Sequence, residues 1–313
     1  MSALDRLPPL VTTGIGSLPF DDPVAAVRHA TRAYGLPFCP QLPRRDGDMV
    51  HEWLGADPLR CGWANDRDRE RPAAWDAFVA AVGAAPPEHR LVKLQVTGPV
   101  TLARALEHAA GRSGVGDGAD GLARELAGWL AGNLAGQVAR LRELGLDALV
   151  VVDEPGLAHA AGCGIAADVW DPLRAVASAW GLHVCGPVPW ALVGAAEPDL
   201  VSFDVTRYCV GGEGAAVLAA LLRRGTRVAW GAVDPVRPDD VCDVAARVAA
   251  GVAATVAAGV PLATVYTQSL VTPACGTGRL ADDRERLVAS LVAAGADVAA
   301  ATWRSQPPSV RVG

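Results

Sequence analysis

The feature that most constrains the fold is a regular alternation between short apolar runs and longer amphipathic stretches. Continuous apolar runs of this length are typical of parallel strands that are buried on both faces. The stretches between them, such as residues 22–34, 121–144 and 282–300, repeat their apolar residues at helical spacing. The pattern predicts an α/β fold, a single (β/α)8 TIM barrel, with an open doubly wound sheet as the alternative. The eight expected strands are residues 12–17, 37–41, 91–97, 148–153, 182–185, 200–204, 227–232 and 263–268.

The connection after the second expected strand is unusually long. Residues 42–87 exceed the length of one loop and one helix, and they are rich in Arg and Asp. We expect an insertion that lies over the mouth of the barrel as a lid, and a solvated charged loop is the alternative. Because no polar linker divides the chain, residues 1–313 are predicted to form one domain.

Composition excludes several classes of function. The chain has 28 Lys and Arg residues against 34 Asp and Glu residues, a net charge of −6, and it has no basic stripe. A nucleic acid or an anionic membrane surface is therefore not expected as the main partner. No stretch of ~18 apolar residues runs without a charge, so no membrane span is predicted. The seven cysteines are odd in number and irregularly spaced, which indicates a reduced, cytoplasmic enzyme without a disulfide framework.

Candidate metal ligands follow three of the expected strands. His183 and Cys185 are two positions apart, so in a strand both would point to the same side. Cys275 lies in a turn between Pro and Gly residues after the last expected strand, and Asp204 ends another strand. One imidazole, two thiols and a carboxylate form a credible zinc set. The alternatives are a core histidine, buried cysteines and an aspartate that caps a turn.

A second group of candidates suits the binding of an amino acid. Asp153 and Glu154 follow a strongly apolar strand, and we expect one to contact a ligand ammonium while a neighbouring cation holds the other. The segment from Gly14 to Ser17 places two glycines where a ligand can approach the backbone, so its amides and Ser17 could bind a carboxylate. A helix-capping acid pair and a simple turn are the alternatives.

Taken together and in order, these segments resemble the C-terminal catalytic barrel of cobalamin-independent methionine synthase and the wider uroporphyrinogen decarboxylase-like superfamily. The resemblance covers nearly the whole chain, as a short, single-barrel member. It implies a zinc ion held by His183, Cys185 and Cys275. It also implies a homocysteine site in which Ile15, Gly16 and Ser17 bind the carboxylate and Asp153 binds the amino group. The segments that carry it are residues 13–17, 96–101, 152–155, 183–185, 202–204, 230–234 and 273–276.

Three departures from the family pattern bear on the substrate and the donor. Asp204 stands where the family has a glutamate ligand. The region of the family's second amino-group acid carries Arg44 and Arg45 instead, which suits a substrate with an extra anionic group. Val236 stands near the family's catalytic histidine, so a proton for the leaving group would have to come from Asp234 or from water.

The resemblance implies a zinc-dependent methyltransferase that acts on a small thiol, homocysteine first, to give methionine. The methyl donor would be a methylated corrinoid, free or protein-bound, or methyl-folate, and Asp153 and Asp234 would be its catalytic carboxylates. Three alternatives stay open: a related zinc alkyltransferase for another, anionic thiol, a metal-free decarboxylase-type barrel, and a non-enzymatic barrel that binds zinc or a corrinoid partner.

Overall fold

The computed structural model describes residues 2–54, 71–111, 119–159, 164–237 and 240–306. Within them the chain forms a curled, fully parallel sheet of seven strands in the order β1-β7-β6-β5-β4-β3-β2. The α/β class and the parallel sheet are therefore confirmed. The strands are β1 (Val11–Thr12), β2 (Leu91–Thr97), β3 (Asp147–Asp153), β4 (Ala179–Val184), β5 (Leu200–Asp204), β6 (Arg227–Val233) and β7 (Ser269–Pro273).

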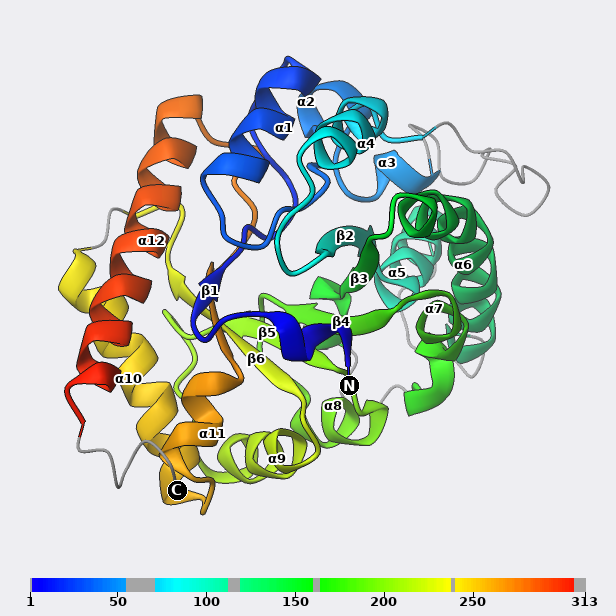
Figure 1. Ribbon diagram of the computed structural model, residues 1–313. Coiled ribbons are helices and arrows are strands. Elements are labelled where there is room, and N and C mark those ends of the chain that lie inside the picture. The colour runs from blue at the N-terminus through cyan, green and yellow to red at the C-terminus, as the bar shows by residue number, and fades with distance from the viewer. Residues whose placement is uncertain (1, 55–70, 112–118, 160–163, 238–239, 307–313) are drawn as a thin grey trace.

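Helices surround the sheet as an outer ring, which runs from α1 through α6 and α9 to α12 in Figure 1. The α-helices are α1 (Pro23–Arg32), α2 (Pro43–Asp46), α3 (His51–Leu54), α4 (Trp75–Ala84), α5 (Pro99–Ala109), α6 (Ala119–Glu143), α7 (Asp171–Val176), α8 (Trp190–Ala196), α9 (Gly212–Arg223), α10 (Val241–Ala257), α11 (Leu262–Thr267) and α12 (Asp282–Arg304). Three short 3-10 helices accompany them: η1 (Ala3–Arg6), η2 (Pro155–His159) and η3 (Ala167–Trp170).

The second expected strand, residues 37–41, forms only isolated bridges, Phe38 with Lys93 and Ser17 with Gln41. These bridges nevertheless join the two edges of the sheet. Cys39 N donates to Lys93 O (3.0 Å) on β2, and Gln41 N donates to Gly16 O (3.0 Å) beyond β1. The ring of parallel backbone is therefore continuous through this segment.

The interior of the ring changes character along its axis. All residues of β2, β4, β5, β6 and β7 are buried, including the polar residues among them, as expected for parallel strands covered on both faces. At the amino ends, inward residues of the strands form a small apolar cluster with Leu4 and Leu7, and the N-terminal segment crosses this end of the ring in Figure 1. Toward the carboxyl ends the buried side chains become polar: Lys93, Gln95, Asp153 and His183.

The prediction of a last strand at residues 263–268 is wrong. Residues Leu262–Thr267 form α11, and the strand that follows is β7, Ser269–Pro273. A short apolar run does not distinguish a strand from a buried helical turn. Here Tyr266 of α11 stacks on Trp303 of α12 (ring centroids 4.7 Å apart), so tertiary packing gives the helix its apolar face.

The described parts of the expected insertion are packed against the barrel. Trp53 and Leu54 of α3 and Trp75 and Phe78 of α4 are at most 5% exposed, which does not suit a solvated charged loop. Residues 55–70 lie outside the described residues. A lid formed by residues 42–87 therefore stays a prediction.

α12 is long and apolar enough, by length and composition, to cross a membrane. It packs along β7, β1, β6 and α10. Its apolar residues therefore serve the core of the barrel.

Glu154 ties β3 to the start of α5. Its fully buried carboxylate accepts hydrogen bonds from Val100 N (3.1 Å), Thr101 N (2.8 Å), Thr101 Oγ1 (2.7 Å) and Trp170 Nε1 (3.0 Å). A carboxylate is stabilised at a helix N-terminus by the free amides and the helix dipole. Contrary to expectation, backbone amides and not a cation hold this acid. The contact requires Gly98, because a Cβ there would lie 2.0 Å from Glu154 Cδ.

We expect Gly98→Ala to destabilise the fold by about 1–3 kcal/mol, the usual cost of overpacking, because the methyl group must displace the Glu154 carboxylate. Urea unfolding followed by circular dichroism measures this loss. Gly128→Ala on α6 is the matched control, since nothing lies within 4 Å of its Cβ position and it should stabilise the helix by about 0.5–1 kcal/mol. Equal stability of the two variants would contradict the role of Gly98.

Candidate active site

A cavity of about 540 Å³ opens at the carboxyl ends of the strands. Active sites of barrel enzymes are built at this end because loops from all strands meet there. Residues from the loops after β1 and β7 and from the ends of β3, β4, β5 and β6 reach it. The sequence-predicted residues that line it are Ile15, Ser17, Asp153, His183, Cys185, Asp204, Asp234 and Cys275.

His183 is the best-defined candidate ligand of a metal ion. Its register partners are Asp153 on β3 and Ser202 on β5, so the three lie side by side. His183 Nδ1 is 2.9 Å from Ser202 Oγ, while the buried Nε2 has no hydrogen-bond partner. Burial, followed by the nearby positive charge of Lys93, lowers the pKa of His183 to about 3. The imidazole is therefore neutral, as a metal ligand must be.

The two candidate thiols come from distant parts of the chain and meet in the cavity. Cys185 directly follows β4, Cys275 lies in the turn after β7, and their side chains are hydrogen-bonded. This hydrogen bond, followed by one from the Gly276 amide, lowers the pKa of Cys275 to about 7 against the opposing effect of burial. The same interaction, together with burial, raises the pKa of Cys185. The pair therefore carries one thiolate more readily than two isolated thiols do.

The carboxylates of Asp204 and Asp234, at the mouth of the cavity, already have partners within the protein. Asp204 accepts from Thr206 N (2.7 Å) and Thr206 Oγ1 (2.6 Å), and Arg207 lies 3.9 Å from it and 3.5 Å from Asp234. Burial raises the pKa of Asp234, but hydrogen bonds from the amides of Val236 and Arg237 outweigh it and lower the pKa overall. Asp234 is therefore held as a carboxylate.

Within the residues that the structure describes, no three His, Cys, Asp or Glu side chains are arranged as a ready metal site. The four candidates nevertheless line the same cavity. Their donor types match those of zinc, and the unpartnered Nε2 of His183 is the atom a metal would use. The donor set fits zinc by its chemistry, and the coordination itself stays a proposal.

Asp153 lines the cavity and is hydrogen-bonded to a residue of β2 behind it. Gln95 Nε2 donates a hydrogen bond to Asp153 Oδ1, and Gln95 Oε1 accepts one from Lys93 Nζ (2.6 Å). Burial raises the pKa of Asp153 and lowers that of Lys93 to about 7, while the attraction between the two charges opposes both shifts. Gln95 thus links the Asp153 carboxyl group to the buried amino group of Lys93.

The backbone candidates lie beside Asp153. Ile15 and Ser17 line the cavity, and Gly16 lies between them with so little space that a Cβ would come within 2.7 Å of Gln95 Cγ. The carbonyl of Ser17 accepts from Thr277 N (3.0 Å), which fixes this turn against the loop after β7.

Arg44 and Arg45 do not line the cavity. Arg44 lies on α2 and pairs with Asp21 and Asp282, both at 3.3 Å, on the outside of the barrel. Among the described residues, the cations that line the cavity are Arg207 and Arg279, which the sequence did not point to.

Glu52 is a second residue that the sequence analysis missed. It lies on α3 inside residues 42–87, is 7% exposed and lines the cavity. Its Oε2 accepts from Gln41 Nε2 at 2.6 Å, and Gln41 bridges to Ser17. An acidic residue in a charged stretch carries no sequence signal for this role, because only the fold turns α3 toward the strand ends.

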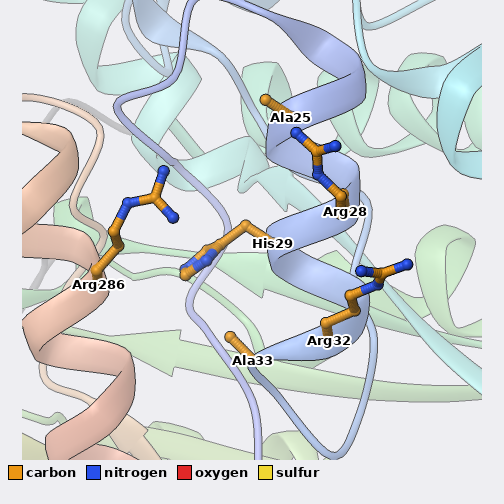
Figure 2. Close-up of a pocket in the computed structure, with 6 residues that line it drawn as sticks. All are labelled: Ala25, Arg28, His29, Arg32, Ala33 and Arg286. Carbon is orange, nitrogen blue, oxygen red and sulfur yellow. The ribbon is translucent and has the colours of Figure 1, made fainter.

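A second cavity, of about 310 Å³, lies between α1 and α12 and contains none of the predicted site residues. Figure 2 shows Arg28 and His29 on α1 and Arg286 on α12, while the guanidinium of Arg32 turns away from that of Arg286. His29 is already held by the buried Glu285 (Nε2 to Oε1, 2.8 Å). These side chains do not line the cavity at the barrel mouth.

Comparison with known proteins shows similarity in the fold alone. No family model matches the chain, and no curated protein matches it. Among solved structures, a B12-independent methionine synthase from Shewanella sp. W3-18-1, determined with selenomethionine, superposes with a TM-score of 0.59 at 14% identity over 95% of this chain and 100% of that one. A methyltransferase from Methanosarcina mazei gives a TM-score of 0.54 at 14% identity over 95% and 96% of the two chains. These solved structures thus share the fold of this chain, as the resemblance in the sequence led us to expect.

In metal-free protein, we expect alkylation of Cys275 by iodoacetamide to reach half its maximal rate near pH 7, since the thiolate is the reacting form. Removing the hydrogen-bond donor in Cys185→Ala should raise this midpoint toward the ordinary thiol range. Mass spectrometry of the Cys275 peptide across pH gives the midpoint in each protein. An unchanged midpoint in the variant would contradict the thiol pairing.

Proposed function

We propose that this chain is a zinc-dependent methyltransferase that methylates the thiol of homocysteine to give methionine. The observation that carries the proposal is the pairing of Cys185 and Cys275 in the same cavity that His183 lines, where the buried Nε2 of His183 has no hydrogen-bond partner. Two thiols, a neutral imidazole and the carboxylate of Asp204 suit zinc better than magnesium or calcium, which prefer oxygen ligands. The superfamily fold, shared with a methionine synthase and a methyltransferase, supports the same reaction class.

The charges at the cavity favour an acceptor that carries an ammonium group. Asp48, Glu52, Asp153, Asp204 and Asp234 line it, against Arg207 and Arg279. Because Arg44 and Arg45 lie elsewhere, the reason for expecting an extra anionic group on the substrate no longer holds. Asp153 and Glu52 would hold the ammonium, and the backbone at Ile15 with Ser17 would hold the carboxylate.

In this mechanism the residues of the chain bind and orient the acceptor. His183, Cys185, Cys275 and Asp204 would hold a zinc ion, which would lower the pKa of the substrate thiol so that a thiolate is available at neutral pH. The amino-acid contacts in the cavity place the sulfur for in-line attack on the methyl carbon. The new carbon–sulfur bond forms as the bond from the methyl group to the donor breaks.

The residues near β6 favour a methylated corrinoid as donor. Methyl-folate leaves as a basic amine that needs a proton, whereas cobalt leaves without one. Val236 supplies no proton, and Asp234 is held as a carboxylate by its amide hydrogen bonds. A donor whose leaving group needs no acid therefore suits this part of the site.

The proposal predicts one zinc ion per chain and methyl transfer to homocysteine, faster from methylcobalamin than from methyl-folate. Elemental analysis and a labelled-methyl assay with each donor measure both. Cys185→Ser and Cys275→Ser should lose zinc and activity, whereas Cys242→Ser, an exposed cysteine on α10, should retain both. Full zinc content in the first two variants would refute the ligand assignment, and no turnover with either donor would refute the reaction.

Glu52→Gln should raise the KM for homocysteine by about 10- to 100-fold, since a hydrogen bond to a charged group contributes about 1.5–3 kcal/mol. The value of kcat should change little, because Glu52 binds the amino group and not the reacting sulfur. Steady-state kinetics of the two proteins test this split. A fall in kcat at unchanged KM would assign Glu52 a different role.

A further inference from the structure

Lys93 is a buried lysine that the proposed chemistry leaves without a role. It lies on β2, is 3% exposed and does not line the cavity. Burying an ammonium group in a protein interior is costly unless it is paired and hydrogen-bonded. Packing alone therefore does not explain why a lysine occupies this position inside the ring.

The ammonium of Lys93 is held at two points. Its Nζ donates to the carbonyl of Ile15 at 2.5 Å and to Gln95 Oε1 at 2.6 Å, and it lies 5.2 Å from the centre of the Phe38 ring. The carboxylate that most favours its charged form is Asp153. Lys93 thus connects the backbone at Ile15, the candidate carboxylate-binding side, with Asp153, the candidate ammonium-binding side.

Gln95 carries this connection to Asp153. An amide has one acceptor and one donor end, and Lys93 can only donate. Because Lys93 occupies Oε1, the Nε2 end must face Asp153, where it donates to Oδ1. The lysine therefore fixes both the orientation of the amide and the position of the carboxylate.

We propose that Lys93 is a positioning residue that makes the cavity selective for a thiol bearing an amino group. Through Gln95 it holds the Asp153 carboxylate toward the cavity, and through the Ile15 carbonyl it holds the backbone that faces the substrate carboxylate. The inference rests on the proposed function, since it assumes that Asp153 binds an ammonium group.

The test compares homocysteine with 4-mercaptobutanoate, the same molecule without its amino group, by calorimetric binding to the purified protein. In Lys93→Met, homocysteine should bind about 10-fold or more weakly, as expected from about 1.4 kcal/mol or more of lost interaction. Binding of 4-mercaptobutanoate should stay within about twofold of its original value, since damage to the fold alone would weaken both ligands.

Lys93, Gln95 and Asp153 form a relay of hydrogen bonds. Two further variants distinguish the loss of this relay from a general loss of stability. Gln95→Leu should reproduce the selective loss, and the double variant should lose no more than either single one, because the residues act in series. Thr97→Val is the matched control: Thr97 also lies on β2 and its Oγ1 donates to Met49 O (2.7 Å), but it is not part of the relay. Its preference for homocysteine should be unchanged.

The outcomes distinguish the two proposals. A wild-type protein that prefers homocysteine, with Lys93→Met keeping that preference, would overturn the role of Lys93 and leave the proposed function standing. Equal weakening of both thiols would also overturn it, in favour of a purely structural lysine. Binding of neither thiol by the wild-type protein would overturn the proposed function, and the inference with it.

Discussion

The continuous ring of parallel backbone is the constraint on which the rest of the structure depends. Parallel register brings the carboxyl ends of the strands to one end of the molecule, where Asp153, His183 and Ser202 become direct neighbours. The hydrogen bonds of Cys39 and Gln41 join the two edges of the sheet, so the loops after β1 and β7 face the end of β3.

The ring also determines which contacts hold the buried carboxyl groups of Asp153 and Glu154. Its amino end is filled by apolar side chains, while its carboxyl end holds polar ones. Asp153 and Glu154 are adjacent in sequence, yet successive residues of a strand face opposite sides. Glu154 turns outward and is held by the start of α5, whereas Asp153 turns inward to Gln95 and the cavity. One residue stabilises the fold and the other is available for a ligand.

The fold is shared with enzymes of low sequence identity, so the chemistry must be argued from this chain's own side chains. Here the charged residues that line the cavity are mostly acidic, because α3 adds Glu52 and α2 keeps Arg44 on the outside. These two placements remove the reason for expecting an extra anionic group on the substrate.

The sequence by itself determined the α/β class, the identity of most strands and the candidate ligands, since unbroken apolar runs and the polar residues that follow them are local signals. Strands 91–97 and 200–204 were predicted to the residue. The tertiary structure decided what depends on distant contacts. It made residues 262–267 a helix through packing on Trp303, reduced residues 37–41 to isolated bridges, and placed Glu52 and Lys93 around Asp153. No local pattern encodes these outcomes, because each partner comes from a part of the chain that only folding brings near.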